Sequence, residues 1–519
     1  MPGTKFHVAA PLTKPADRYK TEESYNWSQT LEKEEAVCVP VEKFVLAPLH
    51  NVFHHIRPGI KLEVPNFDHF QSTKRTIGGV YWVASVLKVH GYKAKLRYEG
   101  AKDDASHDFW MGFGSADVHP VGWCAGQGKP LVPPNFLKDK EEDWKAALVR
   151  AITGSRTLPA DWDNKVKAAL EVSFRTGMRL EVVDRNNSSR VRPARIRQIV
   201  GHRLQLEYSE ADEPNKKKRG DSDQDDVQEM DVWVHKNSPI IFPVGWATRV
   251  GYGLYSNSAY KSHCEEIVKK DVEGRGSEGA PYAKDDASPV FFDPMPKAEF
   301  HPLKEASGSG EPVDKLQANL TAARKELTKW EKGMKLEVLD IVLFNEFHVA
   351  TVNRVLANDY LEVSLDDDAE QPQKLPYNRF SPYLFPVGFC SEHGIPISTP
   401  TKESKKNFDW KSYLKQTQSV AAPKAFFDED RYDSSAFAVK ANVEAVDMRE
   451  PYLICPATIA VKRGSRVVQI RFQGYDESFD QYVDFRSPDI APVGWAELVG
   501  YKLEKPQPSA QMEHDENTA

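Results

Sequence analysis

Short runs of branched and aromatic residues, bounded by turn residues, recur along most of the chain. Such runs predict β-strands when they span about four to ten residues. They gather in four regions: VYWVASVLKV (80–89), ARIRQIV with HRLQLEY (194–208), HVATVNRVL with YLEVSL (348–365), and CPATIAVK with RVVQIRF (455–472). Several short strands joined by turns indicate a small β-barrel in each region.

A second pattern, an aromatic residue that leads a short stretch of helical period, precedes each strand-rich region. It occurs as NWSQTLEKE (26–34), DWKAALVRAI (143–152), AYKSHCEEIVKK (259–270) and DWKSYLKQT (409–417). Each stretch predicts a helix of two or three turns, which is too short to be stable alone. We therefore expect each helical arm to pack on a neighbouring barrel, so that the four units form one assembly.

Two motifs repeat four times in a fixed order, which identifies four copies of one unit. The first is GIKLEVPN (59–66), GMRLEVVD (177–184), GMKLEVLD (333–340) and the more divergent KANVEAVD (440–447). The second is SADVHPVGW (115–123), SPIIFPVGW (238–246), SPYLFPVGF (381–389) and SPDIAPVGW (487–495). In the P-V-G-[WF] segment, proline fixes φ, glycine allows a close turn, and the large ring is expected to plug the barrel.

These copies divide the 519-residue chain into six parts. We expect an N-terminal extension (1–23), repeat 1 (24–135), repeat 2 (136–256), repeat 3 with a long linker-containing arm (257–400), repeat 4 (401–505) and a disordered tail (506–519). Each repeat is long enough to fold as a module.

Composition narrows the classes of function. The net charge of −7 disfavours nucleic acid as the main partner and suits a basic peptide. The five cysteines are scattered and form no C-x-x-C pair, and no apolar run reaches the length of a membrane helix. No motif of a known catalytic, metal or cofactor site occurs, so we expect neither an enzyme nor a cofactor.

The two motifs, the strands between them and the preceding arm resemble the MBT (malignant brain tumour) repeat, a Tudor-related, SH3-like barrel of chromatin proteins. The resemblance covers Ser24 to Lys505, and four copies are similar to the four-repeat repressors of the synthetic-multivulva type. It implies a mainly β fold with helical arms, a nuclear location and partners among repressor-complex proteins. It also implies a monomer that binds histone tails through lysines with one or two, and in some cases three, methyl groups.

The resemblance implies a pocket made of an aspartate that closes the first motif, usually an asparagine three residues later, and three aromatic rings. Repeat 4 has Asp447, followed by Phe472, Tyr475 and Phe479 at the spacing of the family. We expect these rings to form a cage at a strand end and its loop, with Gly474 permitting the turn. Glu450 stands where asparagine is usual and could add a second carboxylate or disturb Asp447.

The other repeats depart from this pattern. Repeat 2 keeps Asp184, Asn187 and Tyr208, but has Ala211 at the second ring position and a long insert before Met230. Repeat 1 has Asn66 instead of aspartate, and Ala101 and His107 follow Tyr98; repeat 3 keeps Asp340 but has Leu343, Leu365 and Asp368. The pattern predicts one complete cage, in repeat 4.

Two classes of function stay open from the sequence. One is a reader of methylated lysine that acts through repeat 4. The other is an interaction scaffold in which repeats 1 to 3 hold partner proteins and the cage is secondary or vestigial. The sequence does not determine which histone lysine is read.

Overall fold

The computed structural model describes residues 24–67, 79–140, 143–212, 214, 232–271, 282–292, 329–342, 346–367, 372–400, 408–427 and 434–506. Met230, Leu343, Asp368, most of the predicted linker in the third arm, the N-terminal extension and nearly all of the predicted tail lie outside these residues. Three of the predicted arm helices are present as α5 (Trp144–Ile152), α8 (Ser258–Lys270) and α12 (Trp410–Gln416), and the first arm forms only a short helix of 4 residues, α2 (Ser28–Leu31). One further helix of the second arm, α6 (Trp162–Leu170), was not predicted.

Each repeat contributes one sheet, whose five main strands are antiparallel and follow the same order in all four. In repeats 2 and 3 a short sixth strand pairs in parallel with the second main strand. Repeat 1 has β1 (Lys61–Pro65), β2 (Tyr81–His90), β3 (Lys93–Tyr98), β4 (Phe109–Gly112) and β5 (His119–Pro120); repeat 2 has β6 (Arg179–Val183), β7 (Arg190–Val200), β8 (Arg203–Tyr208), β9 (Val232–His235), β10 (Ile241–Phe242) and β11 (Gly253–Leu254). Repeat 3 has β12 (Lys335–Leu339), β13 (Phe347–Val355), β14 (Tyr360–Leu365), β15 (Lys374–Asn378), β16 (Leu384–Phe385) and β17 (Ile397–Ser398); repeat 4 has β18 (Asn442–Val446), β19 (Ile454–Arg463), β20 (Val467–Phe472), β21 (Gln481–Asp484) and β22 (Ile490–Ala491). The mainly β fold is confirmed.

The long second strand of every sheet carries a bulge at the equivalent position. The register shifts between Val86 and Lys88, Ile196 and Gln198, Val352 and Arg354, and Ile459 and Val461. An extra residue on one strand bends it and increases its twist, which helps a short sheet to curl. The repetition of the bulge shows that the four sheets share one geometry.

A buried glutamate explains why the two sequence motifs occur together. Glu444 of the first motif accepts hydrogen bonds from the backbone N–H groups of Gly494 and Ala496 in the second, at 2.7 Å each. Glu63, Glu181 and Glu337 make the same pair of bonds in the other repeats. These bonds hold the start of the short helix that follows each glycine: α4 (Trp123–Gly126), α7 (Trp246–Val250), α11 (Phe389–His393) and α13 (Trp495–Val499).

The arms dock on neighbouring sheets, as predicted. Their contacts form a closed ring, in which the first arm meets the last sheet. Single bridges join the second arm to repeat 1 (Thr157 to Lys61), the third arm to repeat 2 (Asp286 to Arg179) and the fourth arm to repeat 3 (Ala421 to Lys335). The first arm joins repeat 4, where Cys38 pairs with Asn442. Each sheet is thus completed by the next arm in the chain, and the last sheet by the first.

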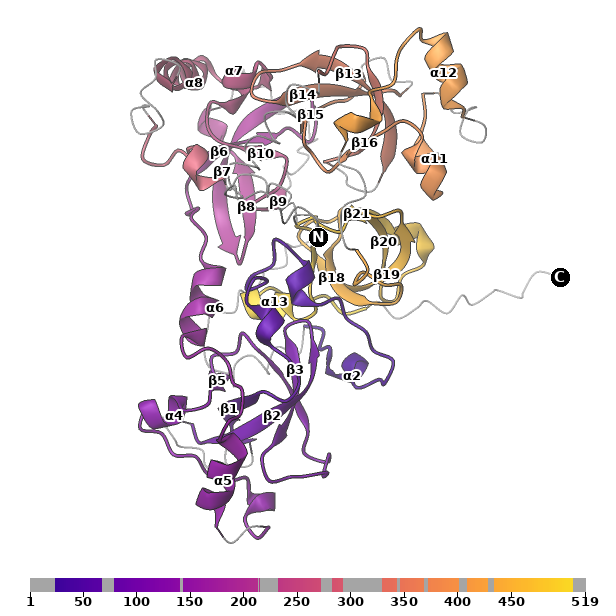
Figure 1. Ribbon diagram of the computed structural model, residues 1–519. Coiled ribbons are helices and arrows are strands. Elements are labelled where there is room, and N and C mark those ends of the chain that lie inside the picture. Colours follow the sequence, from indigo (N-terminus) through magenta and orange to yellow (C-terminus); the bar gives the residue numbers. More distant parts are fainter. Residues whose placement is uncertain are drawn as a thin grey trace, which may run out of the picture.

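Repeats 2, 3 and 4 form a triangle in the upper part of the molecule, with repeat 1 below (Figure 1). We call the turn between the second and third main strands of a repeat its hairpin. We call the S-x-x-x-x-P-V-G-[WF] motif, together with the short helix that follows it, the block of that repeat. The hairpin of repeat 3 packs on the block of repeat 2, where the Tyr360 ring lies 5.0 Å from that of Trp246. The hairpin of repeat 4 packs on the block of repeat 3, where Arg466 donates to the carbonyl of Leu384 at 2.8 Å.

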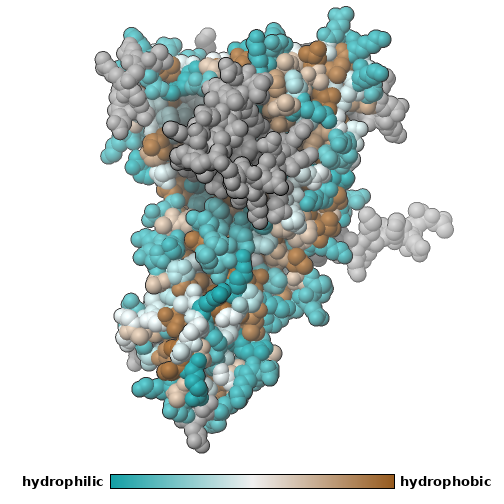
Figure 2. All heavy atoms as spheres, in the orientation of Figure 1, coloured by the Kyte–Doolittle hydropathy of each residue, from teal (hydrophilic) through white to brown (hydrophobic). Residues whose placement is uncertain are grey.

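The hairpin of repeat 2 closes the triangle on the block of repeat 4. Arg203 lies 3.9 Å from the carboxylate of Asp489 and stacks 5.9 Å from the Tyr501 ring. The hairpin of repeat 1 reaches the same block, because the N–H of Tyr92 donates to the carbonyl of Val493 at 2.8 Å. Repeat 1 therefore attaches to the triangle through repeat 4, and the surface view shows it as the narrower lower part of the molecule (Figure 2).

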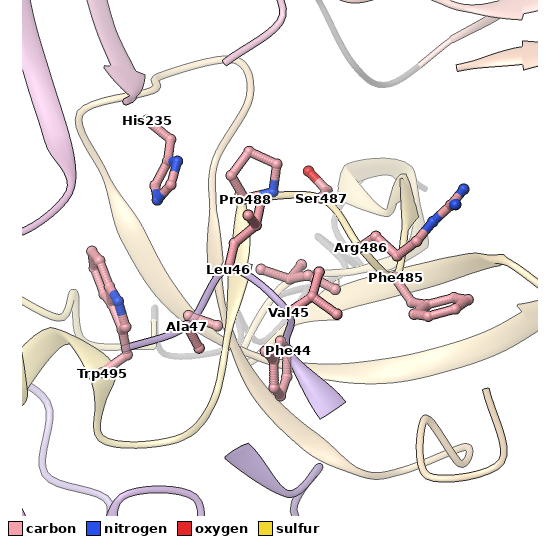
Figure 3. A pocket seen from close by; sticks show the side chains of 12 residues that line it. Phe44, Val45, Leu46, Ala47, His235, Phe485, Arg486, Ser487, Pro488 and Trp495 are labelled. Atoms are coloured by element: carbon pink, nitrogen blue, oxygen red, sulfur yellow. The ribbon is translucent and has the colours of Figure 1, made fainter. Parts of the chain in front are cut away.

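One junction brings three repeats together. Figure 3 shows the first arm at Phe44 and Ala47, repeat 4 at Trp495, and His235 of repeat 2 around one small cavity. Burial lowers the pKa of His235 well below its ordinary value, so this side chain lies in the junction uncharged.

The large ring of the second motif does not have the same surroundings in every repeat, so the prediction that it plugs its own barrel does not hold for all four. Trp246, Phe389 and Trp495 are 5%, 8% and 6% exposed; Tyr360 of repeat 3 helps to cover Trp246, whereas Phe389 packs on Phe347 and Phe385 of its own sheet. Trp123, which no other hairpin reaches among the described residues, is half-exposed. In repeat 2 the ring therefore lies in the seam with repeat 3.

Candidate functional site

The sheet topology of repeat 4 brings the predicted pocket residues to one edge. β18 and β20 both run antiparallel to β19, so their carboxyl ends lie at the same edge of the sheet. Asp447 follows the last residue of β18, and Phe472 is the last residue of β20. The equivalent edge of every repeat holds the equivalent residues, which allows the four sites to be compared directly.

The three rings of repeat 4 form a continuous series. The centroids of Phe472 and Tyr475 lie 6.3 Å apart with planes at 72°, and those of Tyr475 and Phe479 lie 5.2 Å apart at 62°. Gly474 has a φ of 87°, a left-handed conformation that favours glycine, and it turns the chain between the first two rings. Edge-to-face rings of this kind present several π faces to one volume.

The three rings differ in exposure. Phe472 is 3% exposed and packs in the core of repeat 4, whereas Tyr475 is half-buried and Phe479 is 36% exposed. Phe472 is closed because it ends a central strand, so it serves as the floor of the site as well as part of the core.

Gln481 positions the carboxylate of Asp447, a role that the sequence comparison missed. Its side-chain N–H donates to Oδ1 of Asp447 at 3.2 Å, and its carbonyl accepts from the N–H of Met448 at 3.3 Å. The backbone N–H of Arg449 also donates to Oδ1, at 2.9 Å. Gln481 is buried at the start of β21, where its pairing with Ile470 places it beside the ring-bearing strand.

Glu450 pairs with a neighbouring tyrosine. Its Oε2 accepts from the hydroxyl of Tyr452 at 2.9 Å, and that bond, followed by burial, raises the pKa of Tyr452 to about 12. Both hydrogen bonds to the Asp447 side chain come from other residues. Whether Glu450 also adds to the charge of the cage stays a prediction.

Arg449, which the sequence analysis did not single out, holds the outermost ring. Its Nη2 donates to the carbonyl of Ser478 at 3.0 Å, and its guanidinium lies 5.0 Å from the centroid of Phe479. At the other end of the loop, Arg471 forms a bidentate pair with Asp480 at 2.8 and 2.9 Å. The loop that carries Tyr475 and Phe479 is therefore fixed at both ends.

In repeat 2, the chain fills its own pocket. The carboxylate of Asp184 is fully buried and pairs with Arg190 at 2.8 Å, and Arg192 stacks 3.6 Å from the centroid of Tyr208. Asn187 accepts from the N–H of Ser189 at 3.2 Å and is exposed. The predicted residues do come together, but arginine side chains already occupy the charge and the ring face that a ligand would use.

Repeat 1 has rings that the sequence comparison did not find. Tyr98 packs 4.8 Å from Phe109 and 6.4 Å from Phe136, and the exposed His107 stacks on Phe136 at 3.8 Å. Phe109 occupies the strand position that Gln481 has in repeat 4, and Asn66 donates to the carbonyl of Val132 at 3.0 Å. Asn66 therefore stands in this cluster where Asp447 stands in repeat 4.

In repeat 3, Asp340 is buried and accepts from the N–H of Val342 at 2.6 Å. Leu365 is buried at the end of β14, where a ring would stand. Among the described residues of the four sites, a carboxylate and three rings occur together in repeat 4.

The described part of the chain contains no group of three or more His, Cys, Asp or Glu side chains placed to hold a metal ion. None of its helices is long and apolar enough to span a bilayer. The five cysteines are free thiols, four of them buried.

The sequence matches the mbt repeat four times, at residues 61–138, 178–261, 334–404 and 441–509. The chain belongs to the MBT repeat family. Each match begins at the first strand of a sheet or within one residue of it. The MBT repeats are thus the four sheets described above.

Relatives match over almost the whole chain. MBT domain-containing protein 1 of Homo sapiens is 35% identical over 495 residues, which cover 95% of this chain and 68% of that protein. Polycomb protein Sfmbt of Drosophila melanogaster is 36% identical over 494 residues, or 94% of this chain and 37% of Sfmbt. Protein lin-61 of Caenorhabditis elegans is 28% identical over 528 residues, or 97% of this chain and 79% of lin-61.

A solved structure agrees with this arrangement of MBT repeats. It is the crystal structure of the four MBT repeats of Drosophila melanogaster Sfmbt in complex with the peptide RHR(me)KVLR. The TM-score is 0.75 at 35% sequence identity, with 93% of this chain and 99% of the Sfmbt chain covered.

Proposed function

We propose that this chain is a chromatin reader that binds mono- and dimethylated lysine of histone tails through repeat 4. The site consists of Asp447 with the rings of Phe472, Tyr475 and Phe479. One observation carries the proposal: a carboxylate and three rings lie together at the carboxyl ends of β18 and β20. Among the described residues, the equivalent site of repeat 2 is filled by arginine, that of repeat 1 has asparagine in place of the aspartate, and that of repeat 3 has leucine in place of a ring.

The chemistry of the ligand fits these groups. A methylated ammonium keeps its positive charge and gains apolar surface, so aromatic faces attract it. Any remaining N–H of the ammonium donates a charge-assisted hydrogen bond to a carboxylate. Both hydrogen bonds to Asp447 from the described residues end on Oδ1, so Oδ2 can accept from such a ligand.

The Sfmbt structure supports the class of ligand, since that relative is in complex with a peptide that carries a methylated lysine. The net charge of −7 suits a basic histone tail. We extend the proposal to a nuclear protein that acts by binding in transcriptional repression, as the Polycomb relative suggests. Catalysis and a cofactor form no part of this proposal.

Calorimetry of the full chain with the peptide RHRKVLR, synthesised with zero to three methyl groups on the lysine, tests the proposal. Asp447→Asn should abolish methyl-dependent binding. Asp184→Asn is the matched control, because it makes the same change in the arginine-filled pocket of repeat 2 and should leave binding unchanged. Binding that survives Asp447→Asn, or that is lost equally in both variants, contradicts a site in repeat 4.

A second function, an interaction scaffold, is favoured by the filled pocket of repeat 2 and the incomplete pockets of repeats 1 and 3. Arg192 on Tyr208 in repeat 2 and the packed rings of repeat 1 stabilise the fold without leaving a ligand site of the repeat 4 type. In this role the chain holds other proteins of a repressor complex while repeat 4 reads the histone. Partner binding that persists in the Asp447→Asn variant would support the scaffold role, and its loss there would contradict it.

A further inference from the structure

A surface groove lies beside the junction of the first arm with repeats 2 and 4. Val45, Leu46 and Ala47 of the first arm line both the small cavity of Figure 3 and this groove, which has a volume of about 420 Å³. Its other walls come from α6 and from the residues of repeat 2 that follow β9. α6 spans the waist between repeat 1 and the triangle of the other sheets (Figure 1). A groove of this size can receive several side chains of a partner.

The first arm gives the groove an apolar wall of fixed shape. Val45 is 41% exposed, Val52 is partly exposed, and Ala168 of α6 is exposed in the facing wall. Between the two valines, Leu49 has a φ of 64°, which is unusual for a large side chain. Its carbonyl accepts from the N–H groups of Val52 and Phe53, at 2.9 and 3.1 Å. A surface that is already ordered loses little entropy when a partner binds.

The charges of the groove indicate what it receives. Lys165 of α6 and Lys236 of repeat 2 lie in two different walls. No aspartate or glutamate is among the described residues that line the groove, although acidic residues outnumber basic ones in the whole chain, 76 to 69. Lys165 pairs with Asp161 on its own helix at 3.0 Å, and both side chains are partly or largely exposed to water. Such a pair contributes little, so a partner's carboxylate can replace it.

We propose that this groove is a docking surface for a short segment of another protein that carries apolar side chains flanked by carboxylates. The apolar side chains would cover Val45 and Val52, and the carboxylates would pair with Lys165 and Lys236. A basic histone tail has the wrong charge for this surface. The groove is therefore separate from the repeat 4 pocket and does not depend on the proposed function.

Two short synthetic peptides of leucine and glutamate provide the probe. One places leucine at helical spacing and the other at alternate positions, so that a helical and an extended segment are both tested. A third peptide, with lysine in place of every glutamate, is the control for charge. Fluorescence anisotropy of the labelled peptides with the full protein detects dissociation constants below about 0.1 mM. The net charge of −7 repels an acidic peptide elsewhere on the protein, so binding reports a local basic surface.

We expect one of the two acidic peptides to bind and the lysine peptide to bind at least about tenfold more weakly. Lys165→Gln combined with Lys236→Gln should weaken binding about three- to tenfold. Lys167→Gln, on the same helix but outside the groove, is the matched control and should change binding less than about twofold.

Val45→Asp should weaken binding more than about tenfold, because it places a carboxylate on the apolar wall. Val149→Asp, which changes another exposed valine, on α5, should have no effect. The lysine peptide leaves the protein unchanged, so the charge test holds even if a variant is less stable. The proposal is overturned if neither acidic peptide binds, if the lysine peptide binds equally well, or if the control variants weaken binding as much as the groove variants do.

Discussion

The indole N–H of Trp27 donates to Oε1 of Glu444 at 2.8 Å, although 417 positions separate the two residues along the chain. The same carboxylate accepts from the backbone N–H groups of Gly494 and Ala496. Trp410 makes the corresponding bond to Glu337 at 2.6 Å, and Tyr260 to Glu181 at 3.3 Å. The first arm thus completes the last repeat by the same contact that joins repeats adjacent in sequence.

Trp27→Phe should destabilise repeat 4 from a distance. The change keeps most of the packing but removes one donor from a buried carboxylate, at a cost of roughly 1–3 kcal/mol in the free energy of unfolding. Trp27→Ala should cost about 3–5 kcal/mol because it also leaves a cavity. Chemical denaturation measures the loss in the free energy of unfolding, and amide hydrogen exchange shows which strands lose protection.

Trp410→Phe is the matched control for this change. It removes the equivalent bond in repeat 3, so amide exchange should rise in β12 to β16, whereas Trp27→Phe should raise it in β18 to β22. Loss of protection confined to the first arm, with β18 to β22 unaffected, would contradict the long-range role of Trp27.

The buried glutamates should make stability depend on pH. Burial raises the pKa of Glu444 to about 7, against the opposing effect of the N–H groups of Ala496 and Gly494, from an ordinary value of 4.5. The folded protein therefore binds this proton more tightly than the unfolded chain does. The contribution is complete below about pH 4.5 and is lost as the pH rises through about 7.

We expect the free energy of unfolding to fall between about pH 5 and pH 8, by roughly 1–3 kcal/mol for Glu444 alone. Glu444→Gln removes this titration and should flatten the slope, although it lowers stability at every pH. Glu181, whose pKa burial also raises to about 7, should contribute a similar slope. Parallel curves for the wild type and Glu444→Gln would show that Glu444 does not titrate in this range.

Substitutions of the repeat 4 rings should affect binding and stability to different extents, depending on how exposed each ring is. Phe479→Ala removes a ring that is 36% exposed, so it should weaken methyl-lysine binding about tenfold or more at little cost in stability. Phe472→Ala should reduce both binding and stability, the latter by about 3–5 kcal/mol, because this ring is buried. Calorimetry and thermal unfolding of each variant measure the two effects.

Trp495→Ala is the control for loss of fold, since that ring is buried in the seam between repeats. It should lower stability strongly, and binding should weaken only as far as repeat 4 unfolds. A Phe479→Ala variant as unstable as Trp495→Ala would place Phe479 in the core.

The methylation state that repeat 4 prefers should follow from Asp447. Mono- and dimethyl-lysine retain an N–H for the carboxylate, and trimethyl-lysine has none. Loss of that bond should cost roughly 1.5–3 kcal/mol, or about ten- to a hundredfold in affinity, less the gain from one more methyl group on the rings. Titrations with one peptide in four methylation states measure the order, and trimethyl binding as tight as dimethyl would show that Asp447 acts as a point charge.

Arg449 should set the position of the outer ring. Arg449→Ala removes the bond to Ser478 and the stacking on Phe479, so the loop should loosen and binding should weaken about three- to tenfold. Arg449→Lys keeps the charge but not the planar contact and should recover little. Full recovery by lysine would mean that Arg449 contributes charge alone.

The sequence by itself determined the four repeats, the strands between the motifs and the spacing of Asp447, Phe472, Tyr475 and Phe479. These features depend on residues near each other in the chain, because periodicity, turn residues and strand propensity act locally. The tertiary structure alone decided that Gln481 holds Asp447, that Phe472 is closed, and that arginines fill the pocket of repeat 2. It alone decided that Trp27 completes repeat 4. Each of these contacts joins segments whose meeting depends on how whole sheets pack, and local sequence preferences do not carry that information.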